Sequence, residues 1–128
     1  MKLLLDTQAF LWFVEGNSSL STAARQAIED ETHRKFVSPV STWEVAIKVS
    51  LNKLTIAVPF EDLFPGEIAA NGFDVLDPTW EDYRGLLSLP WHHRDPFDRL
   101  LIAQALLNGL TVVTSDSMFA AYGVPTLW

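Results

Sequence analysis

Short apolar runs alternate with segments of helical periodicity along the chain. The runs at residues 3–5, 36–37, 73–76 and 110–114 consist mostly of apolar residues, which predicts strands covered on both faces. Residues 54–58 are also rich in side chains that favour strands. Each run is short and leads into polar residues or a proline, as expected for strands that end in loops.

The segments between these runs predict helices with recognisable ends. Pro65 and Gly66 predict a break in one of them. The predicted helices cover residues 7–14, 21–32, 43–51, 60–70, 79–87, 95–108 and 118–121. The expected caps are Ser21, Ser41, Thr79 and Asp95 at N-terminal ends, and Gly16 and Gly109 at C-terminal ends.

This alternation predicts a three-layer α/β/α domain with a short central parallel sheet. A length of 128 residues suits one domain, so we expect residues 1–128 to fold as a single unit. Ligands of open parallel sheets bind beyond the carboxyl ends of the strands. Asp6 follows the first predicted strand and Asp116 follows the last strong one, so both are expected at that edge.

The composition excludes several classes of protein. With 48% hydrophobic and 20% charged residues, the chain is typical of globular proteins. It has no cysteine, which excludes disulfides, thiolate zinc sites and cysteine nucleophiles. No apolar run approaches the roughly 18 residues of a membrane helix. Asp6 interrupts the one segment that resembles a signal peptide, so we expect a cytoplasmic protein without membrane contact.

The net charge of −7 argues against binding of nucleic acid by charge alone. The nine Lys and Arg residues are spread along the chain and form no basic stripe. Contact with RNA or DNA therefore requires a bound divalent cation or a partner chain that offsets the acidic field.

Four carboxylates stand at the boundaries of predicted elements, namely Asp6, Glu44, Asp98 and Asp116. Each also has a structural explanation. Asp6 can cap the helix that follows it, and Asp116 can start the turn after a strand. Glu44 completes a capping box with Ser41, and Asp98 lies in the first turn of a helix, where the helix dipole favours an acid.

Taken together, the four acids predict a metal site. Carboxylates that converge at one edge of a sheet repel one another unless a cation neutralises them. A site of oxygen ligands without cysteine selects Mg²⁺ or Mn²⁺ over zinc or copper. Such a site can activate water for attack on a phosphodiester, which indicates a nuclease.

Four segments of the chain resemble the PIN domain family, and within it the VapC-type toxins of bacterial toxin–antitoxin pairs. They are LLLDT at residues 3–7, SPVSTWEVAIK at 38–48, DRLLIAQA at 98–105, and LTVVTSD at 110–116 with Phe119 after it. In that family such segments carry the acids of the metal site, which correspond here to Asp6, Glu44, Asp98 and Asp116. The resemblance runs nearly from end to end.

This resemblance implies a Mg²⁺- or Mn²⁺-dependent endoribonuclease that inhibits translation by cutting RNA. Asp6, Asp98 and Asp116 would hold the metal directly, and Glu44 would complete the site directly or through water. The resemblance also implies a homodimer, and a small cognate antitoxin protein whose tail enters the acidic groove.

Several neighbouring residues have roles that the sequence leaves open. Asp95 is interpreted first as an N-cap before Pro96, with a metal role as the minority interpretation. Arg94 and Arg99 are candidates for phosphate contacts, although Arg99 can equally pair with Asp95 one helical turn away. The other candidates for supporting the site are Thr7, Thr114 and Ser115.

The histidine and aromatic residues near the acids are not expected to bind the metal. For His92 and His93 we expect a structural or substrate-contact role, because the family's chemistry does not require them. Trp91, in the same loop, is expected to pack rather than to stack on a base. An oligomer is favoured by the crowding of three aromatic residues on the first helix, Phe10, Trp12 and Phe13.

Two other functions agree with part of the pattern. A phosphate-ester hydrolase or phosphotransferase with an aspartyl nucleophile also places an Asp after the first strand. That mechanism usually has a second acid two residues later, where this chain has Gln8. The remaining alternative is a PIN-like module that binds protein and leaves its acids unused.

Overall fold

The computed structural model describes all 128 residues, and a sheet of five parallel strands lies at its centre. The order across the sheet is β3-β2-β1-β4-β5, so the first strand lies between β2 and β4. Leu4 pairs with Phe36 on one side and with Val112 on the other. The strands are β1 (Lys2–Leu5), β2 (Arg34–Val37), β3 (Asp74–Val75), β4 (Thr111–Val113) and β5 (Thr126–Leu127).

Helical segments connect the strands and follow the predicted order. The run at residues 60–70 is interrupted at Phe64, whose φ of −128° and ψ of 102° are not helical, so the predicted break is confirmed. None of the helices has the length and apolar character that crossing a membrane requires. They are α1 (Thr7–Glu15), α2 (Thr22–Glu29), α3 (Pro39–Ser50), η1 (Asp62–Glu67), α4 (Ile68–Ala70), α5 (Trp80–Leu86), α6 (Pro96–Asn108) and α7 (Ser117–Ala121).

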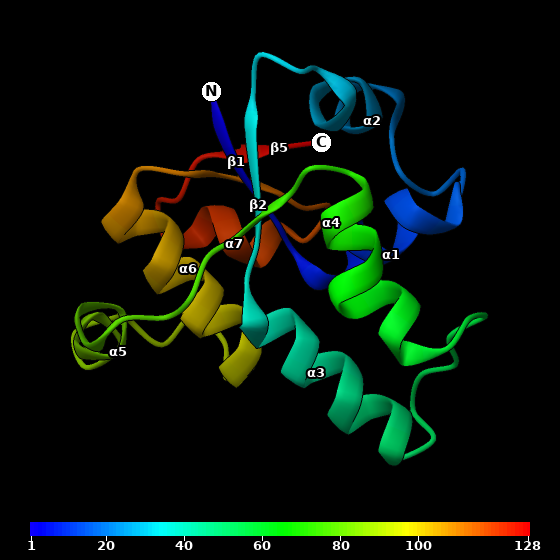
Figure 1. Cartoon of the computed structure of the whole chain (residues 1–128). Helices are drawn as coiled ribbons and strands as arrows, with labels where there is room; N and C mark the ends of the chain where they lie inside the picture. The colour runs from blue at the N-terminus through cyan, green and yellow to red at the C-terminus, as the bar shows by residue number, and fades with distance from the viewer.

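Two layers of helices cover the sheet. In Figure 1, α1, α2 and α4 lie on one side of β1 and β2, and α5, α6 and α7 lie on the other. Leu3 and Leu5 join the core on the first side, whereas Leu4 joins the second core. All three leucines are fully buried, and each contributes roughly 2 kcal/mol by leaving water. Covering of both faces explains the continuous apolar run, and the predicted α/β/α architecture is confirmed.

The helix α3 contacts both helical layers and begins at the carboxyl end of β2. Its Val45 packs in the first core and its Val40 in the second. It contacts both α1 and α6. Because α1 follows β1 and α3 follows β2 with a single residue between, both helices begin at the carboxyl ends of the strands.

Two predicted helix boundaries differ from those in the structure. The helix α3 begins at Pro39 rather than after Ser41, because Ser38 caps it and accepts the Val40 N–H at 3.1 Å. Proline has no N–H to lose in a first turn. The helix α2 ends at Glu29, before the expected residue 32.

The edges of the sheet also differ from the prediction. Residues 54–58 form no strand, and β3 and β5 are the two outer strands of the sheet. Leu54 and Ile56 instead pack against the first core from a loop. The sequence pattern did not predict β5, which has only two residues and pairs with β4.

Candidate functional site

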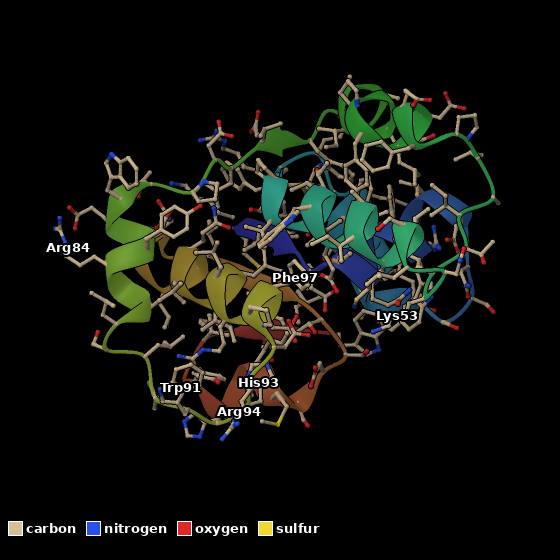
Figure 2. All side chains as sticks on the ribbon, turned by 90° about the horizontal axis from the view of Figure 1, so that it is seen from below. Lys53, Arg84, Trp91, His93, Arg94 and Phe97 are labelled. Atoms are coloured by element: carbon tan, nitrogen blue, oxygen red, sulfur yellow. The ribbon has the colours of Figure 1, made fainter.

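A pocket opens at the carboxyl ends of β1 and β4, where α1, α3 and α6 begin. The structure brings together here all four predicted acids and one more. Figure 2 views the molecule from below, with Phe97 of α6 near the centre and Lys53 at the far end of α3. The five acids in the pocket wall are Asp6, Glu44, Asp95, Asp98 and Asp116. The other residues of the wall are Thr7, Gln8, Leu11, Lys48, Leu54 and Ser115.

Asp6 lies at the junction of β1 and α1 and is only 9% exposed. Its backbone N–H extends the sheet by donating to the carbonyl of Val113 at 3.1 Å. Its Oδ1 accepts the N–H of Ala9 at 2.7 Å and so caps α1. The predicted capping role is therefore confirmed, and it fixes the carboxylate at the wall of the pocket.

Glu44 is 6% exposed on α3 and is held by two side chains. Thr7 Oγ1 lies 2.6 Å from Glu44 Oε1 and 2.8 Å from Ser41 Oγ. Because Thr7 has one hydroxyl proton and a carboxylate only accepts, Thr7 donates to Glu44 and accepts from Ser41. Lys48, one turn further along α3, donates to Glu44 Oε2. The predicted capping box is wrong, because Ser41 lies inside the helix.

Asp98 lies in the first turn of α6, at the wall of the pocket. Its backbone N–H donates to Asp95 Oδ1 at 3.0 Å, which confirms Asp95 as the N-cap. Its Oδ2 lies 3.3 Å from His93 Nε2. The other ring nitrogen of His93 lies 2.7 Å from Tyr122 Oη. His93 therefore links an acid of the pocket to a buried tyrosine, a contact that the sequence pattern did not predict.

Asp116 follows β4 and caps α7, with its Oδ1 accepting the N–H of Met118 at 2.9 Å. The backbone N–H of Asp116 donates to Thr114 Oγ1 at 3.0 Å. Thr114 is 3% exposed and so holds the Asp116 backbone from inside the protein. Ser115, in contrast, lies in the pocket wall itself.

Burial and mutual repulsion make two of these acids difficult to ionise. Burial, followed by the charges of Glu44 and Asp116, raises the pKa of Asp6 to about 6, although hydrogen bonds to its carboxylate oppose the rise. Burial, followed by the charges of the other four acids, raises the pKa of Asp98 to about 8. Lys48 is the one cation in the wall, and its hydrogen bond to Glu44 raises its pKa. Such a cluster favours bound protons or a bound cation.

The donor set suits a hard divalent cation. It consists of carboxylate and hydroxyl oxygens without cysteine, which is the ligand type that Mg²⁺ and Mn²⁺ prefer. As they stand, no three His, Asp or Glu side chains are arranged to hold one ion. Each acid is instead engaged by a protein group, Asp6 and Asp116 by helix ends, Glu44 by Lys48 and Asp98 by His93. The residues fit such an ion by their chemistry and location, provided that side chains exchange partners.

Arg99 does not belong to the pocket. Its side chain is 3% exposed and donates to the carbonyls of Pro90 at 2.7 Å and Leu89 at 3.3 Å. It also donates to Tyr122 Oη at 3.1 Å. The expected pairing with Asp95 and the expected phosphate contact are therefore wrong for Arg99. Its guanidinium group holds the loop before α6 in place through these hydrogen bonds.

The aromatic residues of α1 pack within the chain. Phe10 is fully buried. Phe13 packs on Phe73 and Trp12 packs on Trp128, each pair with ring centroids 5.8 Å apart. The apolar surface from which the sequence favoured an oligomer is thus largely covered internally, so that argument for a dimer does not hold.

Sequence reasoning missed two polar residues of the pocket. Lys48 is four residues after Glu44 on α3, and this helical spacing was the available signal for an ion pair. Gln8 lies beside Thr7 in the first turn of α1. No local pattern distinguishes it from an ordinary exposed helix residue.

Comparison with known families agrees with the observed architecture. The family described as PIN domain matches residues 3–125 of this chain. A comparison with curated proteins gives no match.

Several solved structures share the fold across nearly the whole chain. VapBC2 from Rickettsia felis, bound to a DNA fragment from the promoter, has 13% identity and a TM-score of 0.72 over 99% of this chain and 98% of that one. DNA-bound VapBC from Salmonella typhimurium has 17% identity and a TM-score of 0.73 over 99% and 97%. FitAcB from Neisseria gonorrhoeae has 20% identity and a TM-score of 0.65 over 98% and 96%. At these identities the likeness concerns the fold.

Proposed function

This chain belongs to the PIN domain family, and we propose that it is a Mg²⁺- or Mn²⁺-dependent endoribonuclease and the toxin of a toxin–antitoxin pair. The observation that carries the proposal is the gathering of five carboxylates in one pocket, with the pKa of Asp6 near 6 and that of Asp98 near 8. Acids with strongly raised pKa values lower the stability of the fold, and they are typical of functional sites.

Four of the acids have proposed roles toward the metal. Asp6, Asp98 and Asp116 bind it directly, and Glu44 completes the site directly or through water. A bound Mg²⁺ or Mn²⁺ ion would supply positive charge beside a phosphodiester. It would also make a water molecule acidic enough to act as the nucleophile near neutral pH. The same charge offsets the net charge of −7, which otherwise repels RNA.

Other residues of the chain prepare these acids. Thr7 orients Glu44 through the 2.6 Å hydrogen bond. Thr114 positions Asp116 by accepting its backbone N–H at 3.0 Å. Asp95 caps α6 and so places the first turn of that helix, while Ser115 lies where a polar contact to substrate or water can form. In this proposal Asp95 is a cap and not a metal ligand.

The proposed partners follow from the same family. Structures similar to this chain include DNA-bound VapBC2, VapBC and FitAB. This likeness supports a cognate antitoxin for this chain, whose tail enters the acidic pocket and blocks it. A homodimer, a cytoplasmic location and inhibition of translation by RNA cleavage belong to the same proposal.

Incubation of the purified protein with total RNA tests this function. Cleavage at defined positions is expected with Mn²⁺ or Mg²⁺ and is expected to stop with EDTA, with the new ends mapped by sequencing. Asp6→Asn and Asp98→Asn should each lower cleavage by more than about 100-fold, beyond the effect of losing a residue that only supports a ligand. The matched control is Asp62→Asn, which changes an exposed acid of η1 outside the pocket and should cut normally.

Three results would contradict the proposal. RNA cleavage by Asp6→Asn at the wild-type rate would contradict the assignment of the site. Cleavage in EDTA would contradict the proposed dependence on metal. Isothermal titration without Mg²⁺ or Mn²⁺ binding, together with no cleavage, would favour a protein-binding module whose acids are unused.

A further inference from the structure

Trp91 is 74% exposed in the loop between α5 and α6, yet its ring is firmly supported. The Arg99 guanidinium packs on the ring, with Cζ 3.7 Å from the ring centroid. Arg99 is itself buried and fixed by the two loop carbonyls and by Tyr122 Oη. A cation held in this way supports one face of the indole and leaves the rest of the ring open to solvent.

The loop that carries this ring ends at the acidic pocket, where Asp95 caps α6. Arg99, which supports it, directly follows Asp98, and His93 of the same loop contacts Asp98. In Figure 2, Trp91, His93 and Arg94 are grouped at one edge of the molecule, in the loop that leads to α6. Arg94 is exposed and lines the same surface hollows as Trp91. An aromatic face and a cation thus lie together on the loop that leads to the proposed catalytic acids.

We propose that Trp91 and Arg94 form a binding subsite for one nucleotide of single-stranded RNA, on the surface next to the loop that leads into the acidic pocket. The base stacks on the open face of Trp91, and Arg94 binds a neighbouring phosphate. Indole faces stack on any base, but only on a base that is not paired in a helix. The inference rests on the proposed function and deepens it, because it assigns the binding of one nucleotide of the RNA to two residues outside the acid cluster.

A second exposed tryptophan lacks these features. Trp80 of α5 is 83% exposed, and its hollow is lined by Pro78, Thr79 and Tyr83 without a cation. Trp80 lies outside the acidic pocket and contributes to neither core. Trp80→Ala is therefore a matched control for loss of an exposed indole.

The experiment measures binding without cleavage. A fluorescein-labelled single-stranded RNA of about 10 nucleotides, within the usual span of a single-strand binding groove, carries phosphorothioate linkages that resist cleavage. It is titrated with the full chain in Mg²⁺, which offsets the negative charge of the protein. Fluorescence anisotropy gives the affinity. Trp91→Ala and Trp91→Leu should each weaken binding by about 5- to 150-fold, the effect of removing a stacking platform under one base. The leucine variant keeps an apolar cover on Arg99, and melting curves check that both variants fold.

Four further measurements sharpen the result. Trp91→Phe should retain most of the affinity, and Trp80→Ala should bind as the wild type does. Arg94→Ala should make the slope of log affinity against log salt shallower by about 0.7, the value for one lost phosphate contact on a single strand. A duplex of the same sequence should bind more weakly to the wild type and should be insensitive to Trp91→Leu.

Several outcomes would overturn the subsite. These are equal affinities of the wild type and Trp91→Leu, an equal loss from Trp80→Ala, or no measurable binding of RNA to the wild type. Loss of binding to a protein partner with unchanged RNA affinity in the Trp91 variants would assign this surface to protein instead. If RNA binding depends on Trp91 but the protein does not cleave RNA with metal, the proposed function is refuted and the subsite is not. If the protein cleaves RNA but binding does not depend on Trp91, the subsite is refuted and the proposed function is not.

Discussion

His93 Nε2 lies 3.3 Å from Asp98 Oδ2, and the opposite nitrogen of the same ring lies 2.7 Å from Tyr122 Oη. Tyr122 is held in turn by Arg99, at 3.1 Å. A line of three side chains outside the pocket therefore determines where one oxygen of Asp98 points. Partners of this kind orient the acids that bind a metal and are part of the site's construction.

Replacement of His93 by alanine should weaken both Mn²⁺ affinity and RNA cleavage by about 10- to 100-fold, because Asp98 loses the partner that orients it. Isothermal titration with Mn²⁺ and cleavage rates provide the two measurements. His33→Ala is the matched control, since His33 bonds to the Ala27 carbonyl, outside the pocket. Unchanged Mn²⁺ affinity in His93→Ala would show that α6 alone orients Asp98.

The raised pKa of Asp98, from 3.8 to about 8, predicts how stability depends on pH. The folded protein keeps this proton to a higher pH than the unfolded chain does. The free energy of unfolding without metal should therefore fall as the pH rises from about 4 to 8. Asp98→Asn removes the cost of ionisation, so this variant should be more stable than the wild type by about 1–3 kcal/mol at pH 8 and should show a flatter pH dependence.

Urea unfolding in EDTA, at about pH 5 and pH 8, measures this effect. Asp62→Asn is again the control and should keep the wild-type pH dependence, because that acid lies outside the cluster. A wild type that is equally stable at both pH values would argue against the burial and repulsion described for Asp98.

Lys48→Met should lower the stability of the metal-free protein by about 1–3 kcal/mol, because it leaves Glu44 buried without its cation. Mg²⁺ should recover part of this loss, since an ion can replace the missing positive charge. Melting curves in EDTA and in Mg²⁺ measure both effects. Lys53→Met is the matched control, because Lys53 is exposed and lies outside the pocket wall (Figure 2). An equal loss of stability in the two variants would mean that the contact between Lys48 and Glu44 does not stabilise the fold.

The helix caps show why the sequence was informative about this site. Asp6, Asp95 and Asp116 each accept a backbone N–H at the start of a helix. The sequence predicted this for Asp6 and Asp95, whereas Asp116 was expected to start a turn. In a parallel sheet, a helix that follows a strand begins at the carboxyl ends of the strands, where ligands bind. The topology therefore brings Asp6 and Asp116 together, because they directly follow β1 and β4, whereas Asp95 reaches them through the loop after α5.

Features that depend on distant partners could not be predicted. Arg99 has a carboxylate four residues earlier, but its acceptors are carbonyls of a loop that only the folded chain brings near. Ser38 and Ser41 both resemble N-caps, and the choice of Ser38 reflects the position of Pro39 in the first turn. The strand β5 depends on pairing with the edge strand β4 rather than on its two residues.

Arg99→Lys should destabilise the protein by about 2–4 kcal/mol, although it conserves the charge. A single ammonium group cannot reproduce the planar guanidinium that bonds to two carbonyls and a hydroxyl and supports Trp91. The loop before α6 should loosen, so the His93 amide, which donates to Tyr122 Oη at 3.1 Å, should exchange hydrogen faster. Urea unfolding and hydrogen exchange measure the two effects. Arg25→Lys, at a partly exposed arginine, should change stability by less than about 0.5 kcal/mol. Unaltered exchange at His93 in a destabilised Arg99→Lys protein would show that the loop is held by other contacts.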